Sequence, residues 1–198
     1  MTFTAVGVFC GSQSGARTEY QQAARELAQA LARRRLVAVY GGGHVGMMGA
    51  LADEMLARGG TVIGIIPRHL MRPELAHRGL SELRVVESMH QRKRAMADRS
   101  DAFIVLPGGY GTLEEMFEMV TWLQLQLQSK PVGILNIEGY FDHLLQFLRH
   151  AAQEQFIRRE HWDLLIVDHT PDLLIDRLEL HAHQMKRAHP AAVSSGLS

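Results

Sequence analysis

Residues 102–115 read AFIVLPGGYGTLEE, which is an apolar run, a glycine-rich turn and the start of a helical pattern. A strand followed by glycines and a helix N-terminus forms an anion site, because glycine lets the backbone approach a ligand and the first helical N–H groups lack partners within the helix. The carboxylates of Glu114 and Glu115 follow within the first helical turn. A site that only held a phosphate would not need them, so this stretch points to chemistry beside a bound anion.

The same strand–turn–helix unit recurs along the chain. The expected strands are 5–10, 36–40, 61–66, 83–86, 102–106, 131–135 and 164–167, and the expected helices are 19–34, 45–58, 89–99, 112–127, 141–154 and 172–183. Several strands are apolar throughout, as strands buried on both faces are. This alternation predicts an α/β fold, a doubly wound (Rossmann-like) parallel sheet of about seven strands with helices on both faces. Ligands of such sheets bind beyond the C-terminal ends of the strands.

Composition limits the classes of function. The 198 residues are expected to form one nucleotide-binding domain over residues 1–188, followed by a disordered tail at 189–198. Lys and Arg number 21, as do Asp and Glu, so neither nucleic acid nor a membrane surface is an expected partner. The single cysteine, Cys10, fits a reducing compartment. No secretory signal or membrane span is apparent, and we expect a cytoplasmic protein.

Two readings compete for Glu115. Three expected helices start with a capping-box pattern: Thr18 with Gln21, Ser88 with Gln91, and Thr112 with Glu115. Local rules alone favour Glu115 as the acidic member of such a cap, and the helix dipole favours both Glu114 and Glu115 there. Only the adjacent glycine turn and the Arg92-Lys93 pair argue for chemistry.

Arg92 and Lys93 lie near the start of an expected helix, where the dipole disfavours a cation. An anionic partner would offset that cost. The alternative is a solvated basic face, because Arg94 and Arg99 follow. The position of the pair after an expected strand favours contact with an anion.

The turn GGGHVGMMG at 41–49 matches neither the dinucleotide fingerprint nor a P-loop. It either contacts phosphate, with Gly43 and Gly46 as candidates, or serves tight strand–helix packing, and both readings stay open. Cys10 is expected to be a buried packing residue, since no activating base is apparent. The histidines lack metal-ligand spacing, so no metal is expected.

Two motifs together resemble one known family. The residues and the spacing of these motifs resemble those of the LOG (Lonely Guy) family, the cytokinin riboside 5′-monophosphate phosphoribohydrolases. The motifs are Met89-His-Gln-Arg-Lys93 and Pro107-Gly-Gly-Tyr-Gly-Thr-Leu-Glu-Glu115. Phe9-Cys-Gly-Ser12, Gly46-Met-Met-Gly49, Lys130-Pro-Val-Gly133, Asn136 and Gly139-Tyr140 extend the resemblance over about residues 3 to 180. Gln13 departs from the small residue expected there.

The resemblance implies a homodimer that hydrolyses the N-glycosidic bond of purine nucleoside 5′-monophosphates, AMP or an N6-substituted form, without a cofactor. It implies that Arg92 and Glu115 are catalytic. Family substrate contacts carry over to Glu74, Arg92, Lys93, Gly109, Tyr110, Gly111, Thr112, Leu113, Glu114, Glu115 and Thr121. The backbone of Gly108–Thr112, with help from the turn at 41–46, is expected to bind phosphate. The apolar end of the helix, with Trp122, Leu123, Leu125 and Leu127, suggests burial by the second subunit.

Cleavage of a ribosyl–purine bond passes through an oxocarbenium-like state, which a carboxylate stabilises while it orients or deprotonates the attacking water. We assign this role to Glu115, and to Arg92 the positioning of phosphate, ribose or carboxylate. Two alternatives stay open. One is a nucleotide-binding or sensing protein without turnover. The other is lysine decarboxylase chemistry, a label that the family has often carried, which would need pyridoxal phosphate on a lysine.

Overall fold

The structure of the chain is a computed structural model that describes residues 3–72 and 75–188. Its strands are β1 Ala5–Phe9, β2 Val37–Tyr40, β3 Val62–Pro67, β4 Glu82–Val86, β5 Ala102–Val105, β6 Val132–Leu135 and β7 Leu165–Asp168. They form one sheet in the order β4-β3-β2-β1-β5-β6-β7, and every pairing is parallel. The predicted parallel sheet of about seven strands is confirmed, with strand ends within two residues of expectation.

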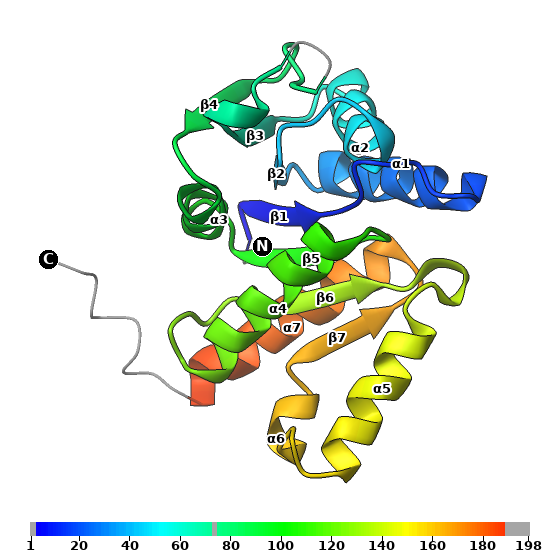
Figure 1. The fold of residues 1–198 in the computed structure, drawn as a ribbon, viewed down its shortest axis with the longest axis vertical. Helices are drawn as coiled ribbons and strands as arrows, with labels where there is room; N and C mark the ends of the chain where they lie inside the picture. Colours follow the sequence, from blue (N-terminus) through cyan, green and yellow to red (C-terminus); the bar gives the residue numbers. More distant parts are fainter. Residues whose placement is uncertain (1–2, 73–74, 189–198) are drawn as a thin grey trace, which may run out of the picture.

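Helices cover both faces of the sheet. They are α1 Thr18–Arg33, α2 Gly46–Ala57, α3 Met89–Asp98, α4 Tyr110–Gln124, α5 Asp142–Gln153, α6 Arg159–Trp162 and α7 Pro171–Ala188. In Figure 1, α4 lies in front of the sheet and α7 behind it. Side chains of β1 alternate accordingly: Val6 and Val8 pack with α1, α2 and α7, whereas Ala5 and Phe9 pack with α3 and α4. The core therefore has two layers separated by the sheet.

The strand order places a crevice between β1 and β5. The chain runs outward from β1 through β2 and β3 to β4, returns to β5 beside β1, and continues outward to β6 and β7. The connections after β1 and β5 therefore diverge to opposite halves of the sheet, which is the usual ligand site of open α/β sheets. At this point the N–H of Gly11 donates to the carbonyl oxygen of Pro107 at 3.0 Å.

Three helix starts differ in how they are capped. The prediction for α3 is confirmed in its main contact, because Ser88 Oγ accepts the N–H of Gln91 at 3.2 Å. The prediction for Thr18 is wrong: α1 begins at Thr18 itself, and the Gln21 amide donates to Ser14 Oγ at 2.8 Å. Gln21 therefore binds the turn that precedes α1 and does not form a capping box with Thr18.

The prediction that Thr112 and Glu115 form a capping box is also wrong. Helix α4 begins at Tyr110 with Gly109 as its N-cap residue, and no side chain caps it. The glycines let the helix begin two residues before Thr112, which places Thr112 inside the helix and releases Glu115 for another contact.

The expectations on one domain over 1–188 and on the tail stay predictions, and residues 189–198 lie outside the described part of the chain, as does Glu74. Sequence patterns missed the one-turn helix α6 and two short 3-10 turns, Arg68–Leu70 and Ile137–Gly139. None of the helices in the described ranges combines the length and apolar character needed to cross a membrane.

Candidate active site

A buried ion pair joins the starts of α3 and α4. Arg92 Nη2 lies 2.9 Å from Glu115 Oε1, and the two side chains are only 8% and 5% exposed. Both helices pack on the same face of the sheet, and Arg92 and Glu115 lie on their buried sides. The attraction between the two charges offsets the large desolvation cost that either charge would carry alone at this depth.

Arg92 lies against the turn after β2 and keeps one unused donor. A Cβ atom at Gly41 would lie 2.2 Å from Arg92 Nη2, so the guanidinium packs closely against the turn after β2 and a larger residue there would displace it. Arg92 Nε is buried and has no hydrogen-bond acceptor among the described residues. A buried unpaired donor is costly, which makes Nε available to an oxygen of a ligand.

Burial raises the pKa of the Glu115 carboxyl above its ordinary value, and the nearby charge of Arg92 only partly opposes this. The pKa of the Cys10 thiol is raised too, by burial first and then by the charge of Glu115. Cys10 is thus a protonated packing residue beside the ion pair, as expected from the sequence, and its neighbour Gly11 lies at the crevice.

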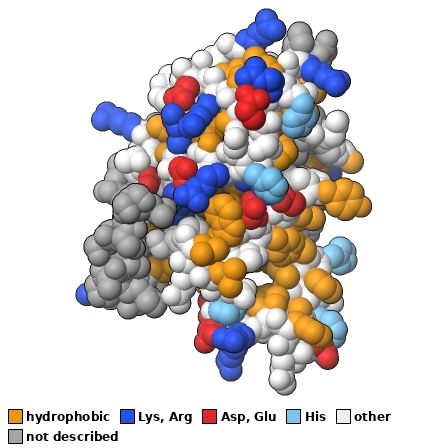
Figure 2. Space-filling view, turned by 60° about the vertical axis from the view of Figure 1, so that its left-hand side comes forward, with side chains coloured by type: hydrophobic (Ala, Val, Ile, Leu, Met, Phe, Trp, Pro, Cys, Tyr) orange, Lys and Arg blue, Asp and Glu red, His pale blue; other side chains and the backbone are white. Residues whose placement is uncertain are grey.

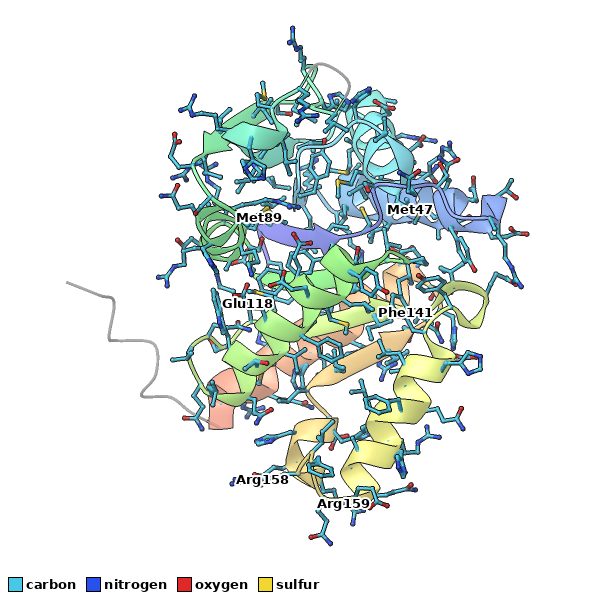
Figure 3. The ribbon with its side chains drawn as sticks, viewed as in Figure 1. Met47, Met89, Glu118, Phe141, Arg158 and Arg159 are labelled. Carbon is cyan, nitrogen blue, oxygen red and sulfur yellow. The ribbon has the colours of Figure 1, made fainter. Side chains whose placement is uncertain are left out.

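Lys93 connects α3 to α4 beside this pair. Its ammonium group binds Glu114, and lies 3.1 Å from Glu118 Oε2; Figure 3 marks Glu118 on α4. Burial alone would lower the pKa of Lys93, but the hydrogen bonds to the two carboxylates outweigh it and raise the pKa. Arg92 and Lys93 therefore do not form a solvated basic face, and their anionic partners belong to the protein. Glu118 was missed, although its spacing of four from Glu114 places both on one helix face.

A cavity of about 270 Å³ opens at the crevice between β1 and β5. Its lining comprises Gly11, Ser12, Gln13, Ser14, Gly15, Tyr20, Met47, Pro107, Gly108, Gly109 and Tyr140. These residues carry no formal charge, so an anion there would be bound by backbone N–H groups, hydroxyls and the N-terminus of α4. The family motifs include Ser12, Met47, Gly108, Gly109 and Tyr140 of this lining, whereas Tyr20 was missed because no local motif marks it.

Glycines close the turns around this cavity. A Cβ at Gly108 would lie 2.1 Å from Thr112 Oγ1 and 2.8 Å from the Gly11 nitrogen. Gly46 has a φ of +63°, and a Cβ there would lie 2.4 Å from the carbonyl oxygen of Ser12. The contacts of Gly46 fit the close-packing interpretation of its turn. Gly43 accepts a hydrogen bond from the Tyr40 hydroxyl at 2.9 Å.

The remaining predicted residues lie at different depths. Tyr110 is 95% exposed at the start of α4, whereas Thr112 is buried. Gly111 and Thr121 are exposed, and Leu113 is half-buried. Within the described residues, the cavity lining includes Gly108 and Gly109 but not Gly43, Gly46 or Thr121. The structure thus brings Arg92 to Glu115 and leaves the outer face of α4 open.

Comparison with known proteins gives one consistent family. A family model described as "Possible lysine decarboxylase" matches residues 48–178. The chain is 46% identical over 185 residues to the probable cytokinin riboside 5′-monophosphate phosphoribohydrolase LOGL2 of Oryza sativa subsp. japonica, covering 93% of this chain and 76% of the rice protein. It is also 46% identical over 180 residues to cytokinin riboside 5′-monophosphate phosphoribohydrolase LOG3 of Arabidopsis thaliana, covering 91% and 84%.

Solved structures share the fold at lower identity. The molybdenum cofactor binding protein of Rippkaea orientalis superposes with a TM-score of 0.67 at 23% identity, covering 91% of this chain and 98% of the other. The molybdenum cofactor carrier protein of Chlamydomonas reinhardtii gives 0.66 at 20% identity, covering 90% and 98%. At such identities the likeness speaks for the fold alone. With the family model and the curated relatives taken together, the chain belongs to the LOG family.

Proposed function

We propose that this protein hydrolyses the N-glycosidic bond of purine nucleoside 5′-monophosphates, releasing the free base and ribose 5-phosphate. The names of its relatives support this reaction. The observation that carries it is the buried carboxylate of Glu115, which is paired with Arg92 and lies on α4, the helix whose N-cap residue Gly109 lines the uncharged cavity. A site that only bound phosphate would have no use for a desolvated carboxylate, which is costly to bury.

Glu115 supplies the charge that the reaction needs. As the glycosidic bond breaks, positive charge develops at the anomeric carbon and ring oxygen, and a fixed carboxylate stabilises it. The same carboxylate orients water or removes its proton. Burial raises the pKa of Glu115 above its ordinary value, which makes this carboxylate a stronger base than an exposed one. Arg92 fixes the position of the carboxylate through Nη2 and offers Nε to an oxygen of the substrate.

The cavity is the proposed phosphate subsite. The N-terminus of α4 opens at Gly109 and Tyr110, and the first N–H groups of a helix favour an anion. Ser14 already accepts a hydrogen bond from Gln21, so its own hydroxyl proton is free to be donated to a phosphate oxygen. The ribose would then extend from this subsite toward Glu115.

Lysine decarboxylation fits the site less well. A Schiff base forms on an uncharged amine, which enzymes obtain by lowering the pKa of a lysine. The ammonium of Lys93 binds two carboxylates, and its pKa is raised instead. We therefore assign Lys93 to the connection between α3 and α4, where it keeps Arg92 opposite Glu115.

The test is incubation of the purified protein with AMP and with the N6-isopentenyl nucleotide, with base and ribose 5-phosphate quantified by chromatography. We expect stoichiometric release of both products from at least one nucleotide and none from the corresponding nucleoside. Tight binding of AMP without products would instead identify a nucleotide-binding protein, and release of cadaverine from lysine would support the decarboxylase.

We also infer a homodimer. Large apolar side chains stand exposed at the end of α4 and around α5, namely Leu125, Leu127, Phe147 and Phe156. Figure 2 shows hydrophobic side chains over the middle and lower part of one face. Exposed apolar patches of this kind mark interfaces between proteins. The cytoplasmic location of the protein rests on the single buried thiol and stays a prediction. Sedimentation velocity should give twice the chain mass of 22.2 kDa. A species of single chain mass at micromolar concentration would contradict the dimer.

A further inference from the structure

We propose that Tyr140 is a positioning residue for the anion subsite, and that its hydroxyl group fixes the Gly108 peptide in the orientation that accepts a phosphate. This inference rests on the proposed function, because it assigns the cavity to the phosphate of the substrate. It concerns a residue outside the two catalytic motifs, on the connection between β6 and α5.

The contact is direct. The Tyr140 hydroxyl donates a hydrogen bond to the carbonyl oxygen of Gly108 at 2.7 Å. On the preceding peptide, the carbonyl oxygen of Pro107 accepts the N–H of Gly11 at 3.0 Å. Both carbonyl groups of the turn are therefore held by neighbouring segments. Tyr140 also lines the cavity, so this bond lies at its wall.

A carbonyl oxygen beside an anion subsite is unfavourable, because its negative end repels the ligand. The phenolic proton of Tyr140 offsets this charge at Gly108. The bond also fixes orientation: the C=O and N–H of a planar trans peptide are antiparallel, so holding the carbonyl of Gly108 fixes the direction of the Gly109 N–H. Gly108 and Gly109 lack side chains that could restrict this peptide, and the restraint must come from elsewhere.

The connection that carries Tyr140 is itself held firmly. Asn136 Oδ1 accepts the N–H of Phe141 at 2.9 Å, and Asn136 Nδ2 donates to Asp142 Oδ1 at 2.7 Å. The Tyr140 ring meets the rings of Tyr20 and Phe141 edge to face, with centroids 5.5 and 4.9 Å apart. Figure 3 marks Phe141 where α5 begins. The hydroxyl is thus presented to Gly108 by a preorganised segment.

The experiment is Tyr140→Phe, which removes the hydroxyl and keeps the ring with both aromatic contacts. We expect KM for AMP to rise about three- to tenfold, the equivalent of one hydrogen bond, with kcat within about twofold. The inhibition constant of ribose 5-phosphate should rise by the same factor, whereas that of free adenine should not change. A purely structural role would shift both inhibition constants together.

Glu138→Gln is the matched control. It removes the exposed ion pair with Arg17 from the same connection without touching Gly108, and should behave as wild type. Unchanged constants for ribose 5-phosphate in Tyr140→Phe, or an equal change for adenine, would overturn the role of Tyr140. If the wild-type protein cleaves no nucleotide, the proposed function fails first. Calorimetric affinities for ribose 5-phosphate then test Tyr140 independently, with the same three- to tenfold loss expected.

Discussion

Glu115→Gln is expected to lower kcat for nucleotide cleavage by about 10²- to 10⁴-fold, with a much smaller change in KM. Glutamine keeps the shape of the side chain but cannot stabilise a developing positive charge or take a proton from water. The loss should therefore fall on the transition state rather than on substrate binding. Chromatographic rates at saturating nucleotide, with calorimetry for the affinity of ribose 5-phosphate, separate the two effects.

Stability must be checked in the same variant, because Arg92 loses its buried partner. Glu82→Gln offers a control that breaks another Arg–Glu contact, the 2.7 Å pair with Arg99, outside the site. We expect full activity from this control. Wild-type kcat in a folded Glu115→Gln protein would refute the catalytic role of Glu115 while leaving the family assignment intact.

Arg92→Met should reduce kcat/KM by about 10²-fold or more, through both KM and kcat. It removes the donor that fixes Glu115 and the free Nε that we assign to the substrate. Methionine fills most of the same volume, so the main cost in stability is the unpaired buried carboxylate, about 3–5 kcal/mol. Steady-state kinetics and chemical denaturation measure the two effects separately.

The stability loss in Arg92→Met should depend on pH. Arg92 lowers the pKa of Glu115 against the effect of burial, so its removal raises that pKa further above the ordinary value. A carboxyl whose folded-state pKa is raised stabilises the folded protein at low pH, and this contribution is lost as pH rises through the raised pKa. The variant should therefore be closer to wild type at acidic pH than at alkaline pH.

A double variant completes the test. Because glutamine carries no charge, Arg92→Met with Glu115→Gln should be less destabilised than the sum of the two single variants. Equal stability losses at low and high pH, together with additive single effects, would contradict a charged pair at this position.

The sequence determined the fold class and the approximate ends of its elements. Apolar runs separated by helix-length segments specify a parallel sheet covered on both faces, because only such strands bury both of their faces. Glycine positions such as Gly46 and Gly108 could be found as turns, since a backbone that must approach another backbone closely leaves no room for a Cβ. The two family motifs gave Arg92 and Glu115 as candidates.

Tertiary structure decided what those candidates contact. Local rules assign Glu115 to a cap with Thr112, but α4 begins earlier and its carboxylate binds Arg92 from another helix. Likewise Tyr20 and Tyr140 reach the cavity from distant segments. Local propensities describe neighbours along the chain within about one helical turn, whereas charges buried between packed elements are satisfied by whichever partner the strand order brings near. The chain alone therefore names the reacting groups, and only the packing of α3 and α4 on the same face of the sheet brings them together.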